Sequence, residues 1–94
     1  MKFNVGCGWR DFGEDWIHID AGDYKHLDSD DIHLYDYEHN SADLIYASHV
    51  IEYFDREEIK VLLSDWKDVL KPSGILRLAV PNFEKIVSLY IKGY

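Results

Sequence analysis

The chain has 94 residues, of which 47% are hydrophobic and 30% charged, and its formal net charge is −8 at pH 7. This length suits one compact domain, so residues 1–94 are treated as a single domain. The composition argues against a disordered chain. The sequence has no apolar run long enough to span a membrane, and its acidic charge would repel nucleic acid. We therefore expect neither a membrane nor nucleic acid as a partner.

The first residues bear on the compartment. Residues 1–5 lead directly into a strand-like run, without the apolar stretch and cleavage site of a signal peptide. Cys7 is the single cysteine, and a lone cysteine that cannot form an internal disulfide fits a reducing environment. We therefore expect a cytoplasmic protein.

Two short apolar runs predict neighbouring strands near the N-terminus. Residues 2–5 predict a buried strand that is stopped by the glycines at 6 and 8, and residues 16–20, "WIHID", predict the second strand. Residues 9–15 are too few for a full helix, so this connection is expected to be a loop or a single turn. Parallel strands usually need a dozen residues or more to cross over, which makes the connection unusual.

The middle of the chain predicts up to two further strands. Residues 25–29, "KHLDS", are a candidate for the third strand, and residues 30–41 form a polar connection. Residues 42–50, "ADLIYASHV", contain a continuous apolar run of the kind that is buried on both faces of a parallel sheet. We expect that run to be the fourth strand.

The second half of the chain predicts a helix, a strand and another helix. Asp55 followed by Glu58 is a helix-start signal, and apolar residues then recur at steps of three and four. They are Ile59, Leu62, Leu63, Trp66, Val69 and Leu70. Residues 71–74, "KPSG", predict the helix end and a turn, residues 75–80 a strand, and residues 83–91 a second helix. This order favours an α/β fold with a mainly parallel sheet.

A glycine pair after the first strand and an acid at the end of the second are typical of a nucleoside site. Gly6 and Gly8 let backbone N–H groups approach a ligand with no Cβ in the way, and Asp20 can accept hydrogen bonds from ribose hydroxyls. The alternative interpretation is a tight turn beside a solvated acid. A nicotinamide-binding unit is disfavoured, because Asp20 lies only 12 positions after Gly8 and the third glycine of G-x-G-x-x-G is missing.

Four segments resemble successive motifs of the class I S-adenosylmethionine-dependent methyltransferases. They are "NVGCG", "WIHIDAG", "NSADLIYASHVIEYF" and "LKPSGILRLAVPNFE", and together they span nearly the whole chain. The resemblance implies a Rossmann-like three-layer sandwich with a mainly parallel sheet of strand order 3-2-1-4-5. Members of that family add an antiparallel strand pair after the last helix, and from the 94 residues given we expect a fold without those last two strands.

The resemblance also implies S-adenosylmethionine as the cofactor and assigns residues to it. Gly6, Cys7 and Gly8 would lie under its methionine part, and Asp20 would hold the ribose. We interpret Cys7 as a small packing residue rather than a nucleophile.

Two further segments are assigned by the resemblance. Asp30, with Asp31 as the competing assignment, would approach the adenine amino group, although this acidic cluster equally fits a solvated loop. Ser48 and His49 would close over the cofactor. His49 and Glu52 could form an acid/base pair, but the sequence favours a contact that orients the loop or caps the start of a helix. The histidines have no ligand spacing, so no metal site is expected.

The implied activity is methyl transfer to a small-molecule or saccharide acceptor, and the alternative is a non-catalytic S-adenosylmethionine-binding half-domain or partner subunit. Alignment of the nucleophile should carry most of the catalysis, and the sequence identifies no catalytic residue. Without the family's last strands, the apolar edge of strand 75–80 is expected to be covered by a second copy in a homodimer or by a partner chain. A clean monomer in light scattering at high concentration would count against this.

Overall fold

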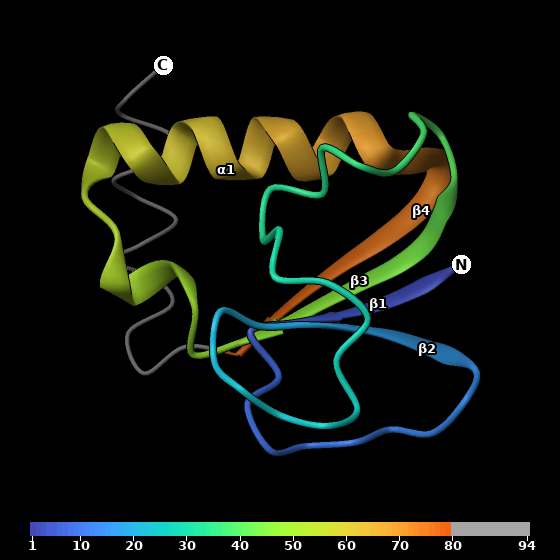
Figure 1. Cartoon of the computed structure of the whole chain (residues 1–94). Helices are drawn as coiled ribbons and strands as arrows, with labels where there is room; N and C mark the ends of the chain where they lie inside the picture. The colour runs from blue at the N-terminus through green and yellow to red at the C-terminus, as the bar shows by residue number, and fades with distance from the viewer. Residues whose placement is uncertain (80–94) are drawn as a thin grey trace.

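The computed structural model describes residues 1–79, which form a parallel sheet and the helices that follow its third strand. The elements in chain order are β1 (Lys2–Val5), β2 (Trp16–Ile19), β3 (Ala42–Ser48), the short 3-10 helix η1 (Ile51–Tyr53), α1 (Arg56–Val69) and β4 (Leu70–Ala79). The strands are arranged side by side as β2-β1-β3-β4 (Figure 1), and every neighbouring pair is parallel. The predicted helix over residues 83–91 lies outside the described residues.

The α/β architecture is confirmed, but the prediction of a third strand over residues 25–29 is wrong in extent. That segment contributes only one parallel bridge, between Ser29 and Ile19, on the outer side of β2. Leu27 is its single large apolar residue, so a full strand there would have little to bury. The position is nevertheless the expected one, because with Ser29 in third place the order becomes 3-2-1-4-5.

The predicted turn at residues 71–74 is also corrected. The chain enters β4 directly after α1, and residues 71–74 form an irregular part of that strand. Leu70 pairs with Ala42 and Ile75 pairs with Leu44, so the residues between them bulge out of register. Pro72 is tolerated there because β4 is the edge strand of the described sheet. What covers this edge stays a prediction.

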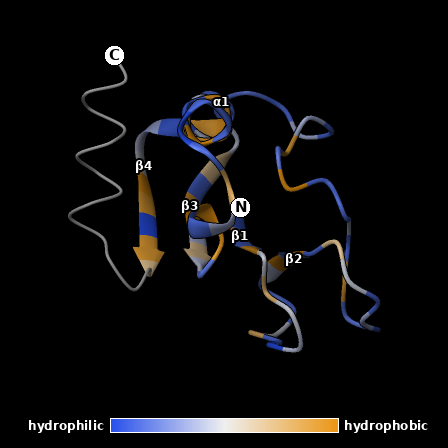
Figure 2. Cartoon of the chain, turned by 90° about the vertical axis from the view of Figure 1, so that its left-hand side faces the viewer, coloured by the Kyte–Doolittle hydropathy of each residue, from blue (hydrophilic) through white to orange (hydrophobic). Residues whose placement is uncertain are grey.

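The core lies between α1 and one face of the sheet. The strand registers place Phe3, Ile17 and Ile45 in one row across β1, β2 and β3, and Phe3 and Ile45 are fully buried. The predicted helical stripe faces this row, and α1 buries Ile59, Leu62, Trp66 and Val69. Figure 2 looks along α1 and shows the strands beneath it in the order β4, β3, β1, β2.

The start of α1 is built as the sequence predicts. The Asp55 side chain accepts a hydrogen bond from the Glu58 backbone N–H at 2.9 Å, and the Glu58 carboxylate accepts one from the Asp55 backbone N–H at 3.4 Å. This reciprocal pair is a capping box. The hydrogen bond from the Glu58 backbone lowers the pKa of the Asp55 carboxyl below its ordinary value. No helix within residues 1–79 is long and apolar enough to cross a membrane.

The opposite face of the sheet carries the β1–β2 connection, which is a loop, as predicted. The Phe12 ring lies with its centroid 5.1 Å from that of Trp16 and 5.7 Å from that of Tyr46. Trp16 and Tyr46 belong to rows of residues that alternate with the core rows. These aromatic contacts therefore cover the face of the sheet that a crossover helix covers in strand–helix–strand units with a longer connection.

An ionic cluster at the amino end of β3 makes the stability of the fold at low pH depend on Asp43. The N-terminal ammonium lies 2.6 Å from one carboxylate oxygen of Asp43, and the Lys71 ammonium lies 2.9 Å from the other. These two hydrogen-bonded cations lower the pKa of Asp43 to about 2. The folded pKa is thus below the unfolded value of about 3.9, so the stabilisation is present above about pH 4 and is lost as the pH falls through about 2.

We therefore expect the Asp43→Asn variant to lose less stability than the wild type between about pH 4 and pH 2. Urea unfolding followed across that pH range measures it. Asp23→Asn, which removes an exposed carboxylate elsewhere, should keep the wild-type acid slope. Identical slopes for the wild type and Asp43→Asn would contradict the assignment.

Candidate functional site

The carboxyl ends of the parallel strands bring most of the sequence-predicted residues to one edge of the sheet. Residues 6–8 follow β1, Asp20 follows β2, and His49 follows β3. The chain leaves β1 toward β2 on one side of the sheet and later returns to β3 on the other. Figure 1 shows the carboxyl ends of the strands at one edge of the sheet. In open parallel sheets, ligands generally bind beyond the carboxyl ends of the strands at such a switch point.

The turn after β1 and the acid after β2 are in direct contact. Gly6 and Gly8 both have positive φ, +66° and +57°, a conformation that glycine adopts without strain. The Gly8 backbone N–H donates to Oδ2 of Asp20 at 2.8 Å, and the Gly22 backbone N–H donates to Oδ1 at 2.7 Å. One carboxylate thus joins the glycine turn to the turn that follows β2.

The segment after β3 packs against the same glycine turn. A Cβ atom built on Gly6 would overlap Cγ2 of Val50, whereas one built on Gly13 would meet nothing within 4 Å. Val50 is buried. The missing side chain at Gly6 therefore lets the turn after β1 and the segment after β3 meet.

This close approach predicts that Gly6→Ala is destabilising and that Val50→Ala relieves part of the cost. Overpacking costs about 1–3 kcal/mol, in addition to the strain of a positive φ. Gly13→Ala is the matched control, because Gly13 also has a positive φ, +99°, but open space around it. The free energies of unfolding of the two alanine variants, each with and without Val50→Ala, measure the overlap. Equal losses for Gly6→Ala and Gly13→Ala would contradict the packing.

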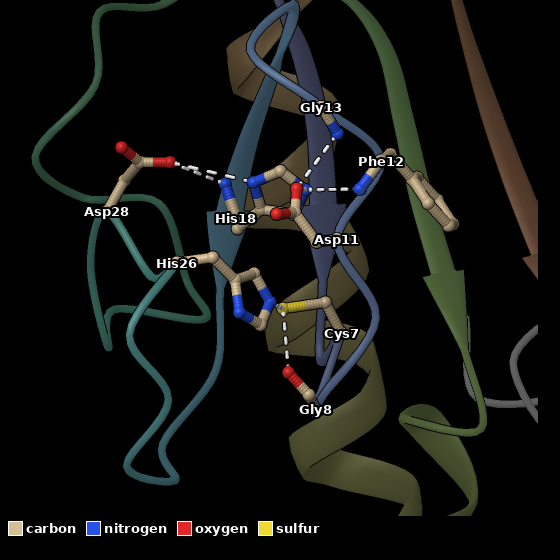
Figure 3. Close-up of polar contacts among 8 residues, drawn as sticks. All are labelled: Cys7, Gly8, Asp11, Phe12, Gly13, His18, His26 and Asp28. Atoms are coloured by element: carbon tan, nitrogen blue, oxygen red, sulfur yellow. Dashed lines mark hydrogen bonds and ion pairs between the residues drawn. The ribbon is translucent and has the colours of Figure 1, made fainter.

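Cys7 is buried at the base of the turn. Its Sγ lies 3.6 Å from Nε2 of His26 and 3.5 Å from the Gly8 carbonyl oxygen (Figure 3). Burial, and then the nearby Asp20 carboxylate, raise the pKa of the Cys7 thiol. A thiol that stays protonated is a poor nucleophile, which favours the interpretation of Cys7 as a packing residue.

A buried histidine that sequence reasoning missed holds the loops around β2. His18 is 2% exposed, and its Nε2 accepts a hydrogen bond from the Phe12 backbone N–H at 2.8 Å. The His18 backbone N–H donates to the Asp28 carboxylate at 2.8 Å (Figure 3). His18 thus connects the β1–β2 loop to the segment after β2 through these two hydrogen bonds. The position of His18 inside the apolar run "WIHI" could have indicated from the sequence that this histidine is buried.

The two candidate adenine-side acids have different surroundings. The Asp31 carboxylate accepts hydrogen bonds from the backbone N–H groups of His33 at 3.2 Å and Asp36 at 3.1 Å, so it organises its own turn. Asp30 is exposed and directly follows the bridge residue Ser29. Asp30 therefore has the place of an acid at the carboxyl end of a third strand.

Ser48 ends β3 and His49 follows it, beside β4. Ser48 is buried and pairs with Ala79, whose carbonyl oxygen accepts a hydrogen bond from the His49 backbone N–H at 2.7 Å. His49 has a φ of +56°, and its Nδ1 lies 3.1 Å from Oε2 of Glu52. The structure thus holds both residues at the same edge as the glycine turn.

A separate acidic hollow lies along β2 and the β1–β2 loop. It has a volume of about 360 Å³ and is lined by Asp11, Gly13, Glu14, Trp16, His18, His26 and Asp28. Despite these side chains, residues 1–79 contain no group of three or more His, Cys, Asp or Glu residues placed to hold a metal ion.

Comparison with known protein families gives a match over most of the described chain. Residues 18–78 match the family model described as a methyltransferase domain. Neither the search of curated proteins nor the search of solved structures found a match. The matched range runs from β2 into β4 and includes Asp20, Asp30 and His49, whereas the glycine turn precedes it.

Proposed function

The chain belongs to the methyltransferase domain family, and from that premise we propose that it binds S-adenosylmethionine at the carboxyl edge of its sheet and transfers the methyl group to a small-molecule or saccharide acceptor. The observation that carries the proposal is the hydrogen bond between the Gly8 N–H and Asp20. It joins two elements that follow different strands and that together would form the proposed nucleoside site.

The residues at this edge fit the cofactor. Each oxygen of the Asp20 carboxylate accepts one backbone N–H and keeps a further lone pair for a ribose hydroxyl. The bare backbone at Gly6 and Gly8 would hold the methionine part, with the side chain of Cys7 turned into the protein. Ser48 and His49 would close the site from the side of β3.

At the adenine end, the proposal uses Asp30 rather than Asp31. The Asp31 carboxylate is engaged by two backbone N–H groups of its own turn, whereas Asp30 is exposed beside the bridge to β2. An exposed carboxylate at that position can accept a hydrogen bond from the adenine amino group. Asp30→Asn should therefore weaken cofactor binding more than Asp31→Asn, once both variants are shown to be folded.

Bound S-adenosylmethionine would supply a methyl group on a sulfonium centre, which is already a good leaving group. The protein's own part is then to bind the cofactor, hold the acceptor in line and exclude water. The net charge of −8 disfavours polyanionic acceptors such as nucleic acid, which supports a small neutral or cationic molecule or a saccharide.

Calorimetric titration with S-adenosylhomocysteine, followed by an assay for methyl release from S-adenosylmethionine, tests the proposal. We expect saturable binding, and turnover with at least one member of a panel of small molecules and saccharides. Binding without turnover would favour the non-catalytic half-domain. No binding of S-adenosylhomocysteine, or binding of NADH in its place, would overturn the proposed cofactor.

A further inference from the structure

His49 combines backbone strain with an oriented imidazole ring. Its φ of +56° lies in the left-handed region, where a residue with a Cβ is strained because the Cβ crowds the following carbonyl oxygen. The hydrogen bond from its N–H to the Ala79 carbonyl holds the backbone there, and the Nδ1 contact to Glu52 holds the ring. Strain that is held in place from two sides is common where a side chain must be aimed.

Glu52 decides which ring nitrogen is available. An ionised carboxylate only accepts hydrogen bonds, so the 3.1 Å contact with Oε2 of Glu52 places the proton of the neutral ring on Nδ1. Nε2 then carries the lone pair. The His49 side chain is 52% exposed, so this lone pair is accessible from outside the protein.

The neighbours of His49 place it between the cofactor turn and the edge of β4. The next residue, Val50, packs on Gly6, and the His49 backbone is joined to the last described residue of β4. Oε1 of Glu52 is buried and accepts no hydrogen bond from the described part of the chain. Its negative charge is therefore free to stabilise a positive charge on the adjacent ring.

We propose that His49 is the general base of the methyl transfer, with Glu52 as the residue that positions it, and that the acceptor reacts through a hydroxyl group. This inference rests on the proposed function. Nε2 takes the hydroxyl proton while an oxygen electron pair forms the bond to the methyl carbon. The carbon–sulfur bond breaks with its electron pair left on sulfur, so the products are a methyl ether, the thioether and a protonated His49.

An adenosine that carries an aziridine ring at its 5′ position tests this placement without knowledge of the acceptor. The strained ring puts an electrophilic carbon near the position of the transferable methyl group. Attack by Nε2 forms a carbon–nitrogen bond and opens the ring, whose own nitrogen takes up a proton. We expect a single covalent adduct, mapped to His49 by peptide mass spectrometry and suppressed by excess S-adenosylhomocysteine.

His39 is the matched control, because it is exposed and lines a hollow at the far end of α1 with Lys67 and Leu70. It should stay unlabelled by the adenosine reagent, whereas a simple aziridine without adenosine should show no preference for His49. If S-adenosylhomocysteine binds but the adduct is absent or lies on another residue, the inference is wrong and the proposed function stands. If S-adenosylhomocysteine does not bind, the proposed function fails and the inference with it.

Glu52→Ala tests the positioning role separately. Nitrogen-15 NMR of the imidazole should show the Nδ1–H form in the wild type and a shift toward the Nε2–H form in Glu52→Ala, with labelling of His49 reduced at least about tenfold. Glu52→Asp should restore part of both signals. An unchanged ring form and labelling rate in Glu52→Ala would show that the contact only orients the start of η1, which contradicts the positioning role.

Discussion

Asp20→Ala is expected to weaken binding of S-adenosylhomocysteine by about 10- to 150-fold. Hydrogen bonds to a charged group contribute about 1.5–3 kcal/mol, and the carboxylate both holds the Gly8 N–H and offers its remaining lone pairs to the ribose. The loss combines a missing ligand contact with a loosened glycine turn. Calorimetric titration measures the affinity, and a thermal melt of the same sample reports whether the fold is retained.

Two variants separate these contributions. Asp20→Asn keeps an oxygen that can accept one of the two backbone N–H bonds, so it should preserve more of the turn and still lose most of the ribose contact. Asp23→Ala removes a nearby exposed carboxylate and should bind as the wild type does. Cofactor affinity within error of the wild type in Asp20→Ala would refute the ribose assignment.

Trp66→Ala is expected to lower the free energy of unfolding by about 3–5 kcal/mol. The Trp66 side chain is fully buried between α1 and the sheet, and its Nε1–H donates to the Ile32 carbonyl oxygen at 2.7 Å. That hydrogen bond attaches the long β2–β3 connection to the helix. Because domains of this size are stable by only about 5–15 kcal/mol, the variant should be close to unfolding, which urea titration shows.

Trp66→Phe and Val61→Ala are the comparison variants for that measurement. The phenylalanine variant keeps most of the buried ring and leaves the Ile32 carbonyl without its donor, so a loss of about 1–3 kcal/mol is expected. Val61 lies on the same helix and is 52% exposed, and its truncation should change stability by no more than about 0.5 kcal/mol. Equal losses for Trp66→Ala and Val61→Ala would contradict the position of the core.

The fold could be predicted where local patterns and burial agree. The capping residue Asp55 marks the start of α1, and the stripe that ends at Val69 faces the sheet because it repeats with the period of a helix. Residues 25–29 and 71–74 were mispredicted for the same reason. Both are polar segments whose shape is set by the neighbouring strand, through the single bridge at Ser29 and the bulge before Ile75.

In the candidate site too, features that depend on contacts between distant segments could not be predicted from the sequence. The positions of Gly6, Gly8 and Asp20 were predictable, because they follow strands that are visible in the sequence, whereas their role in binding stays a prediction. The role of Val50 was not predictable, since only the fold brings it against Gly6. The connection made by His18 was not predictable either, because it depends on a backbone N–H of a loop without regular structure.

The most direct test of a cofactor site at the turn after β1 is an amide NMR titration with S-adenosylhomocysteine. The amides of Gly6, Gly8 and Gly22 should shift most as the ligand saturates, while Asp43 and Lys71, which pair at the amino end of β3, should not move. Saturable shifts confined to other residues, with the glycine amides unaffected, would contradict the assignment of this edge as the place where the cofactor binds.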